Sequence, residues 1–346
     1  MCRSSGIGVY LRHVVRHLAD EHTTDFRLTL LGGDPVPGVS DHRPCLAPIY
    51  SASELLEVPA RVPRNTDILW SPNYNAPVVS RGRLVVTVHD ACHLALPDLF
   101  NSRLKQGYAK LMFANVKRRA ARVICDSRFT ATEVTRLTGL EPERMMVIYP
   151  GLSHSWSAPS DAPRPIAAPY LLFVGNVKPH KNLGRLLLAF EVLKDRIPHT
   201  LAIVGKREGF ITPDRAVAVA AERLGERVFF TGEVSDDVLR AYYAHSDLLV
   251  FPSLYEGFGM PPLEAMATGI PVAASTAGSI PEVCGEAAAY FDPYSVDDMS
   301  AVIERTLADE AVRTRLRGAG KQQIARYLWA STASQIASVF HEVAAS

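Results

Sequence analysis

The chain has 346 residues, of which 47% are hydrophobic and 21% are charged, and its formal net charge is +1. This length allows two domains of ordinary size, and the balanced charge gives no electrostatic reason to expect a nucleic-acid partner. No run of about 18 apolar residues predicts a membrane span, and the N-terminus has glycines and charges where a signal peptide needs an apolar segment.

The cysteines are scattered along the chain and form no C-x-x-C pair. They are Cys2, Cys45, Cys92, Cys125 and Cys284. This spacing argues against a zinc cage or a disulfide framework, and it is typical of a protein of the reducing cytoplasm.

Short apolar runs alternate with longer amphipathic stretches, which is typical of parallel sheets covered by helices on both faces. In the first half, strands are expected at 27–33, 67–72, 83–90, 122–127 and 145–151, with a helical pattern at 103–121. After residue 168 the rhythm restarts, with strands expected at 169–176, 199–206, 227–233, 247–253, 271–275 and 288–293. We therefore predict two doubly wound α/β domains, at 1–153 and 169–326, joined by a linker at 154–168 that is rich in Pro, Ser and Ala.

Several expected strands end in polar residues and glycines. These ends are His89-Asp90, Gly175-Asn176, Gly205-Lys206 and Gly232-Glu233-Val234. Ligands of open parallel sheets bind at the carboxyl ends of the strands. Lysines and glycines just ahead of helix N-termini suit a phosphate, because backbone N–H groups and the helix dipole favour an anion there.

The stretch PSLYEGFGMPPLEAMATGIPV (252–272) contains two glutamates separated by glycines and a Pro-Pro pair. Glu256 is expected in a loop and Glu264 about one turn into the following helix, because prolines suit a first helical turn. The amides of Phe258, Gly259 and Met260 would then line the helix entrance. The carboxylates suit two parts of a hydroxyl-rich ligand, but a solvated loop glutamate and a first-turn glutamate complementing the dipole would also explain them.

This stretch, together with GSIPEVCGEAAAYFDP (278–293), VTVHD (86–90) and LLFVGNVKPHKN (171–182), resembles the signature of family 4 retaining glycosyltransferases. The resemblance covers essentially the whole chain. It implies the GT-B fold, in which two Rossmann-like domains face a cleft and close on the donor. It also implies that a C-terminal helix at 327–346 crosses back to the N-terminal domain.

The resemblance implies a site for a nucleotide-diphospho-sugar. Glu256 would contact the donor sugar, Glu264 the ribose hydroxyls and Lys181 the diphosphate, while His89 would face the transferred sugar. Main-chain groups around Gly232 and Val234 would meet the base. The remaining residues implied are Lys206, Asn176, Gly257, Phe258, Gly259 and Met260 on the donor, and Gly6 and Gly8 in an N-terminal loop.

Two departures from the family pattern stand out. Asn176 occupies a position that is often arginine in the family, so Lys178 or Lys206 would have to supply the second positive charge. The family also begins with a buried strand ahead of its glycine loop, and this first strand is expected to be absent here. Its absence would expose strand edges and leave Gly6 and Gly8 poorly positioned.

The roles of two neighbouring side chains stay open. His89 would bind a sugar hydroxyl or accept a hydrogen bond near the reacting carbon, unless it simply bonds to backbone. Asp90 would orient His89 or cap the following turn. The basic stretch KRRAAR (117–122) would touch an anionic membrane surface or form a solvated helix end.

These residues predict a retaining transferase of hexosyl or deoxyhexosyl groups, with GDP-mannose as the first donor to test and a glycan or lipid-linked acceptor of surface polysaccharide synthesis. No cofactor and no metal are expected, since no Asp-x-Asp motif is present and lysines with helix-entrance amides can stabilise the leaving phosphate. The expected location is the cytoplasm or the inner face of the membrane. A nucleotide-sugar 2-epimerase-like isomerase and an inactive or truncated protein are the alternatives.

Overall fold

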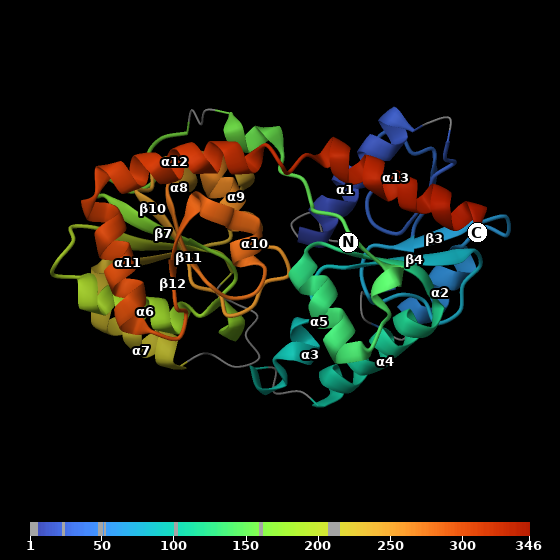
Figure 1. Cartoon of the computed structure of the whole chain (residues 1–346), viewed down its shortest axis with the longest axis horizontal. Helices are drawn as coiled ribbons and strands as arrows, with labels where there is room; N and C mark the ends of the chain where they lie inside the picture. Colours follow the sequence, from blue (N-terminus) through green and yellow to red (C-terminus); the bar gives the residue numbers. More distant parts are fainter. Residues whose placement is uncertain are drawn as a thin grey trace. The chain divides into compact units, whose positions relative to one another are not determined.

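The structure is a computed structural model, and it describes residues 6–22, 25–47, 51, 53–99, 103–158, 162–206 and 215–346. The chain divides into two compact units (Figure 1). Unit 1 comprises Met1–Gly151 and Tyr327–Ser346, and unit 2 comprises Leu152–Arg326. Each has its own parallel sheet and its own core, as continuous apolar strands between helices require.

Unit 1 contains the helices α1 (Gly6–Glu21), α2 (Glu54–Arg61), α3 (Cys92–Ala95), α4 (Arg103–Arg119), α5 (Arg128–Thr138) and α13 (Trp329–Ala345). Its strands are β1 (Thr29–Leu31), β2 (Asp41–Arg43), β3 (Ile68–Ser71), β4 (Arg83–Val88), β5 (Ala120–Cys125) and β6 (Met145–Val147). The last four strands form a parallel sheet in the order β3-β4-β5-β6, and β1 pairs separately with β2. The sequence of strand β2 is Asp-His-Arg, and because all three residues are polar, the strand was not predicted.

A cavity of about 700 Å³ lies within unit 1. Its lining includes residues of β1 and β3 together with residues of α1 and α13. In the described part of the chain, β1 pairs only with β2, and β3 pairs only with β4. One edge of β1 and one edge of β3 therefore have no strand partner among the described residues.

Two glycines that were predicted to lie in an N-terminal loop lie in a helix instead. Gly6 and Gly8 belong to the first turn of α1 and not to a loop. The helix persists because Tyr10, Val14 and Leu18 repeat at helical spacing and are buried against α13 and the sheet. Burial of this apolar face outweighs the helix cost of about 1 kcal/mol for each glycine.

Unit 2 contains the helices α6 (Leu183–Leu193), α7 (Arg215–Leu224), α8 (Asp236–Ala244), α9 (Met260–Ala267), α10 (Ile280–Cys284), α11 (Val296–Ala308) and α12 (Glu310–Ile324). Its strands are β7 (Tyr170–Val174), β8 (Thr200–Val204), β9 (Val228–Gly232), β10 (Leu248–Phe251), β11 (Val272–Ser275) and β12 (Ala288–Phe291). All six strands are parallel, in the order β12-β11-β10-β7-β8-β9. Beta7 is central and buried throughout, which explains its uninterrupted apolar sequence.

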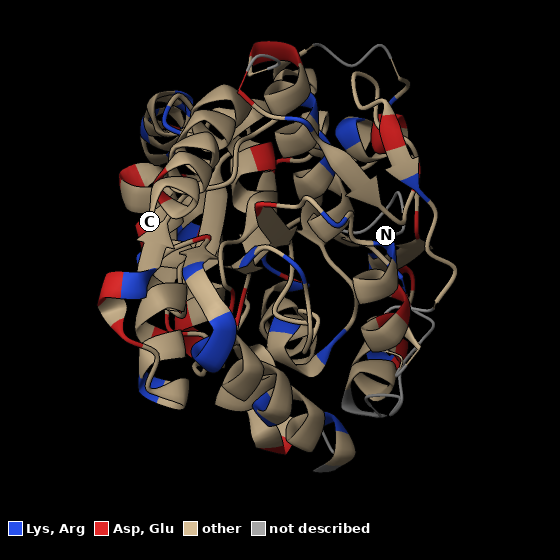
Figure 2. Cartoon of the chain, turned by 90° about the vertical axis from the view of Figure 1, so that its right-hand side faces the viewer, with Lys and Arg blue, Asp and Glu red and all other residues tan. Residues whose placement is uncertain are grey.

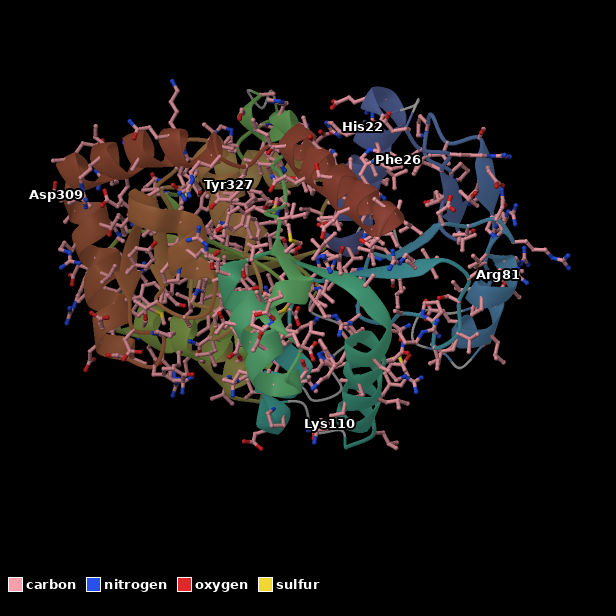
Figure 3. The ribbon with its side chains drawn as sticks, turned by 45° about the vertical axis from the view of Figure 1, so that its right-hand side comes forward. His22, Phe26, Arg81, Lys110, Asp309 and Tyr327 are labelled. Carbon is pink, nitrogen blue, oxygen red and sulfur yellow. The ribbon has the colours of Figure 1, made fainter. Side chains whose placement is uncertain are left out.

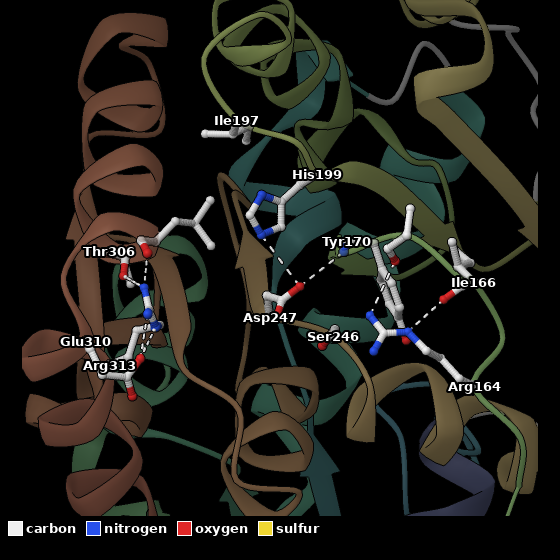
Figure 4. A network of polar contacts seen from close by, with 12 residues as sticks. Arg164, Ile166, Tyr170, Ile197, His199, Ser246, Asp247, Thr306, Glu310 and Arg313 are labelled. Carbon is white, nitrogen blue, oxygen red and sulfur yellow. Dashed lines mark hydrogen bonds and ion pairs between the residues drawn. The ribbon is translucent and has the colours of Figure 1, made fainter.

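A polar network fixes the amino ends of the central strands of unit 2 (Figure 4). The carboxylate of Asp247 accepts a hydrogen bond from the Tyr170 backbone N–H at 3.2 Å and lies 3.5 Å from Nε2 of His199. These contacts tie the starts of β7, β8 and β10 together. The residues predicted to bind a ligand lie at the opposite end of the sheet, beyond the carboxyl ends of the strands.

The structure confirms the predicted class, two α/β units with parallel sheets, and each expected strand overlaps an observed one. Lys and Arg are interspersed with Asp and Glu (Figure 2), in accord with the net charge of +1. Among the described residues, no helix is both long enough and apolar enough to cross a bilayer.

Candidate donor site

The strand order of unit 2 reverses between β7 and β10. The chain moves from β7 outward to β8 and β9, and then crosses back to β10, β11 and β12 on the other side. In doubly wound sheets the crevice at this reversal is where ligands bind. The segment after β7 carries Lys181, and the segment after β10 carries Glu256, so the two predicted residues share this position.

Lys181 and Glu256 meet directly. Lys181 Nζ lies 2.7 Å from Glu256 Oε1, and the two side chains are only 18% and 12% exposed. Burial raises the pKa of Glu256, but the charges of Lys181 and His180 and the hydrogen bond from Lys181 lower it by more, so the net pKa lies below its ordinary value. Glu256 is therefore a carboxylate at neutral pH and cannot act as an acid there.

Asn182 holds the segment that carries Lys181. Its φ of 58° is the only positive value found at a non-glycine residue in the described chain. Its side-chain amide donates to the carbonyls of Pro252 at 3.0 Å and Pro293 at 2.7 Å. The carbonyl of His180 accepts from the Leu254 N–H at 2.7 Å, so the two segments at the reversal point are joined by hydrogen bonds.

The turn after β11 holds the loop that carries Glu256. Ser279 is fully buried, and its hydroxyl contacts the carbonyls of Glu256 at 3.0 Å and Phe258 at 2.9 Å. Gly278 has a φ of 64°, and a Cβ there would lie 2.9 Å from the Glu256 backbone nitrogen. Only glycine fits this conformation and this close approach.

The entrance of α9 follows the same loop. Gly259 precedes the helix with a φ of 95°, and Met260, Pro261 and Pro262 form its first turn. Phe258 is buried, whereas Met260 is half-buried. Gly269 follows the helix with a φ of 78°, as a C-terminal glycine does. Pro261 and Pro262 have no N–H group, so the amides at the entrance of α9 are those of Gly259 and Met260, at the partially positive end of the helix.

Glu264 lies in α9 and has a different environment. Its Oε2 accepts a hydrogen bond of 2.8 Å from the hydroxyl of Tyr243, a fully buried residue of α8. Burial raises the pKa of Glu264 to about 7, although the Tyr243 hydrogen bond lowers it. The rings of Trp156 and Tyr243 pack edge to face with centroids 5.4 Å apart. Glu264 therefore changes charge near neutral pH.

The neighbouring strand ends surround the reversal point with further polar groups. Asn176 Oδ1 accepts from the Lys206 N–H at 3.1 Å, and Lys206 Nζ forms an exposed ion pair of 2.9 Å with Glu233. A Cβ at Gly205 would lie 2.3 Å from the carbonyl oxygen of Gly175, so the β7 and β8 ends approach closely. Gly232 ends β9, Val234 follows it, and both are half-buried.

In unit 1, His89 follows β4 and both of its ring nitrogens are engaged. Nδ1 lies 2.6 Å from Oδ2 of Asp126, and Nε2 lies 2.9 Å from the carbonyl oxygen of Pro72. A carbonyl only accepts, so Nε2 carries a proton, and an ionised Asp126 requires a second proton on Nδ1. Burial lowers the pKa of His89, but Asp126, the Pro72 carbonyl and the charge of Asp90 together raise it above its ordinary value, with Asp126 the largest contributor.

Asp90 caps the following turn, and this settles its open role. Its carboxylate accepts a hydrogen bond of 2.9 Å from the Cys92 N–H. Asp126, which follows β5, is the residue that orients His89. The rings of Tyr10 and His89 pack edge to face with centroids 4.9 Å apart.

Four supporting residues escaped the sequence reasoning: Tyr243, Asn182, Ser279 and Asp126. Each acts on a residue distant in sequence, so spacing alone could not connect them. A weak signal existed for Asp126 and Ser279, because Asp126 lies at the end of the expected strand at 122–127 and Ser279 comes four residues after the one at 271–275. Among the described residues, no group of three or more His, Cys, Asp and Glu is placed to hold a metal ion.

Two α/β units with parallel sheets, one with a cation–carboxylate pair at its strand-order reversal, define an α/β protein of GT-B type. The family described as Glycosyltransferase Family 4 matches residues 4–156, and the family described as Glycosyl transferases group 1 matches residues 159–323. The O-antigen chain mannosyltransferase B of Escherichia coli is 30% identical over 286 residues, which cover 79% of this chain and 74% of that protein. The chain belongs to the family 4 glycosyltransferases.

Two further proteins resemble the chain over part of their length or in fold alone. The serotype-specific mannosyltransferase WbdA of Escherichia coli is 32% identical over 231 residues, which cover 62% of this chain but only 28% of WbdA. The chain thus matches little more than a quarter of that relative. The structure of Anabaena HepE in complex with UDP and glucose superposes with a TM-score of 0.76 at 18% identity, over 98% of this chain and 96% of that chain, and shows the shared fold.

Proposed function

We propose that the chain is a retaining, metal-independent glycosyltransferase that moves a hexosyl or deoxyhexosyl group from a nucleotide-diphospho-sugar to a glycan or lipid-linked acceptor. Mannose from GDP-mannose is the first donor to test, because the mannosyltransferases named above are about 30% identical to this chain. The meeting of Lys181 and Glu256 at the strand-order reversal is the observation that carries the proposal.

The chemistry follows from the charges at this point. Breaking the bond between the sugar carbon and the diphosphate builds negative charge on the departing oxygen. Lys181 has three N–H donors, so it can keep Glu256 as one partner and still donate to a phosphate oxygen. The amides at the entrance of α9 add a second positive element, and such preorganised groups stabilise developing charge at no reorganisation cost.

The carboxylates would hold the rest of the donor. Glu256, which is ionised and fixed by Lys181, suits the hydroxyls of the transferred sugar, because a charged acceptor makes the stronger hydrogen bonds. Glu264 suits the ribose hydroxyls. Lys206, Asn176 and the backbone around Gly232 and Val234 would complete the nucleotide end. In unit 1, His89 would present a positive charge to the sugar rather than a free nitrogen.

Substitution of Glu256 tests this assignment. Glu256→Gln keeps the side-chain volume but removes the charge, and it should lower transfer by about 100-fold or more, as loss of a preorganised electrostatic contact does. Nucleotide binding, measured by calorimetry, should change by less than about tenfold because the nucleotide contacts remain. Glu304→Ala, an exposed glutamate of the same unit, is the matched control and should leave both quantities unchanged.

The assay itself separates the alternatives. A screen of GDP-, UDP- and dTDP-sugars by thermal shift identifies the donor, since preferential binding raises the melting temperature. Free nucleoside diphosphate should be released only when an acceptor is present. Transfer should continue when EDTA removes divalent metal ions. Appearance of an epimeric nucleotide sugar without acceptor would indicate an isomerase. Normal transfer by Glu256→Gln would contradict the assignment of that residue.

For location, the proposal places the protein in the cytoplasm, with access to the inner face of the membrane when the acceptor is lipid-linked.

A further inference from the structure

Tyr10 of α1 connects His89 to the start of helix α13 within unit 1. Tyr10 is only 3% exposed, and its ring packs edge to face with the His89 ring at a centroid distance of 4.9 Å. The rings of Tyr10 and Trp329, the first residue of α13, also pack edge to face, with centroids 5.8 Å apart. Among the described residues, Trp329 has ring contacts with Tyr10 and His13 but none with His89. The path of ring contacts from Trp329 to His89 therefore runs through Tyr10.

Trp329 is itself held in place by α1. The imidazole of His13 stacks on the Trp329 ring with centroids 4.7 Å apart and an interplanar angle of 4°. Burial and the charges of neighbouring basic residues of α1 lower the pKa of His13 to about 4, so this ring is neutral at pH 7 and stacks as an uncharged aromatic group. His13 and Tyr10 are three residues apart, so they are neighbours on one side of α1 and hold Trp329 together.

Trp329 also lies where the chain returns to unit 1. The chain leaves this unit after Gly151 and re-enters it at Tyr327, which is labelled in Figure 3. A Cβ on Gly151 would lie 2.2 Å from the Trp329 backbone nitrogen, so the leaving and returning segments touch here and only glycine fits. The Thr332 hydroxyl donates to the Tyr149 carbonyl at 2.8 Å, and the rings of Tyr149 and Tyr327 pack edge to face at 5.8 Å. The start of α13 is therefore fixed against the segment that ends at Gly151.

The ring of Tyr10, and not its hydroxyl, makes the link to His89. The hydroxyl is buried and accepts or donates no hydrogen bond of normal geometry within the described chain, although Thr87 lies near it. The Thr87 hydroxyl instead accepts from the Trp70 ring nitrogen at 2.9 Å. Burial and the charge of Asp126 raise the pKa of Tyr10 well above its ordinary value, so the phenol stays neutral and acts on His89 through packing.

We propose that Tyr10 and Trp329 are positioning residues for His89: the start of α13, fixed against Gly151, holds the Tyr10 ring against the imidazole and thereby fixes its orientation. A ring packed against His89 limits its rotation and keeps water from its hydrogen bond with Asp126. This inference deepens the proposed function and rests on it, because the orientation of His89 matters for transfer only if His89 faces the sugar. Accurate positioning of such a group is worth large factors in rate.

Proton NMR of the Nδ1–H of His89 tests the link without any sugar. Tyr10→Leu removes the ring, so exchange of this proton with water should become at least about tenfold faster. The kcat of transfer should fall at least about tenfold, while the Kd of the donor changes less than about twofold. Tyr10→Phe keeps the ring and should match the wild type within about twofold in each quantity.

Substitution of Trp329 tests action through Tyr10. Trp329→Leu should speed the same exchange and lower kcat, although Trp329 has no ring contact with His89 among the described residues. In the Tyr10→Leu background, Trp329→Leu should have little further effect, because residues of one contact chain are not additive. The control is Val343→Ala, which truncates another buried side chain of α13 and should leave the exchange and kcat unchanged.

Three outcomes would overturn this inference. They are wild-type exchange and kcat in Tyr10→Leu, a Tyr10→Phe variant as impaired as Tyr10→Leu, and fully additive effects of the two leucine substitutions. An equal effect in Val343→Ala would likewise assign the change to lost stability, which chemical denaturation of each variant measures.

Failure of the link is distinct from failure of the proposed function. If the wild type transfers sugar and the Nδ1–H exchanges at the same rate in every variant, only the positioning role is lost. If the exchange changes as expected but the wild type transfers no sugar from any donor, only the proposed reaction is lost.

Discussion

At the scale of single residues, the donor site contains two glutamates with opposite pKa shifts. The pKa of Glu256 lies below its ordinary value because Lys181 outweighs the cost of burial. The pKa of Glu264 rises to about 7 because the side chain is buried and the charge of Asp236 raises it as well, while the Tyr243 hydroxyl compensates only in part. The first carboxylate has a fixed charge at neutral pH, whereas the second gains its charge as the pH rises.

Nucleotide-sugar binding should therefore depend on pH through Glu264. A carboxylate accepts ribose hydroxyls better than a neutral acid does, so the Kd should fall by up to about tenfold per pH unit from about pH 5 to about pH 7 and then level off. Calorimetry with GDP-mannose measures this, because its diphosphate has no ionisation near neutral pH.

The control is Glu264→Gln, which cannot ionise and should bind more weakly with a flat pH profile. A wild-type Kd that stays constant between these pH values would show that the charge of Glu264 plays no part in binding.

His89 should be held as an imidazolium by Asp126. Its raised pKa means that the pair stabilises the folded state most below about pH 6.5, the ordinary value for histidine, and that this stabilisation is lost as the pH rises through the folded value. Asp126→Asn should cost about 3–5 kcal/mol at acidic pH, as breaking a buried pair does, and less at alkaline pH.

Nitrogen NMR of the imidazole ring gives a direct readout of the protonation of His89. Both ring nitrogens should carry protons at pH 7 in the wild type and only one in Asp126→Asn. A neutral His89 ring at pH 7 in the wild type would contradict this account. Asp90→Asn is the matched control for the direct bond, since Asp90 caps the turn at Cys92 and acts on the ring by its charge alone, as the smallest contribution to the raised pKa, so both ring nitrogens should keep their protons.

At the scale of elements, the loop between β10 and α9 is held from two sides. The segment after β7 contacts it through Asn182 and the His180 carbonyl, and the turn after β11 contacts it through Ser279. A loop bonded to both neighbouring strand ends keeps Glu256 in position, and such positioning is worth large factors in rate.

Substitutions in the turn after β11 should therefore act on Glu256 from a distance. Gly278→Ala places a Cβ 2.9 Å from the Glu256 backbone at a positive φ, so we expect a loss of about 2–4 kcal/mol of stability and a large fall in kcat. Ser279→Ala removes only the hydroxyl contacts and should lower kcat about tenfold while costing about 1–2 kcal/mol. Steady-state kinetics with chemical denaturation measures both.

Gly269→Ala provides the comparison. It also has a positive φ, but a Cβ there has open space and lies beyond the far end of α9. It should cost stability without lowering kcat. An equal fall in kcat for Gly269→Ala would mean that backbone strain alone, and not the position of Glu256, explains the effect.

At the scale of the whole molecule, each unit buries its own core. In unit 2, α6, α7 and α11 pack apolar side chains against the sheet, and in unit 1 the helices α1 and α13 do so on one face. Tyr327–Ser346 belong to unit 1 although they follow unit 2 in sequence. Arg83 also donates to the carbonyl of Val343, which anchors the C-terminal helix within unit 1.

Donor binding should stabilise unit 2 specifically. The residues assigned to the nucleotide all lie in Leu152–Arg326, so ligand at 100 times its Kd should add about 2.7 kcal/mol to that unit. Hydrogen exchange should slow in the segments after β7 and β10, while the sheet of unit 1 exchanges at its original rate. Protection confined to unit 1 would place the nucleotide elsewhere.

The sequence by itself determined the two α/β units, the positions of nearly all the strands, and Glu256, Glu264 and Lys181 as candidate residues. These features are local, because they depend on apolar runs, on glycines and prolines beside them, and on motifs within a few residues of a strand end. The helix at Gly6 was missed because its glycines suggest a loop, whereas its stability comes from packing against α13.

Only the tertiary structure decided which residues meet. The strand order brings the ends of β7 and β10 together, and Lys181 pairs with Glu256 across 75 positions of sequence. It also assigned Asp126 to His89 and Tyr243 to Glu264, and so set which groups are charged at neutral pH. The physical reason is that burial and hydrogen bonding depend on neighbours in space, whereas sequence patterns report neighbours along the chain.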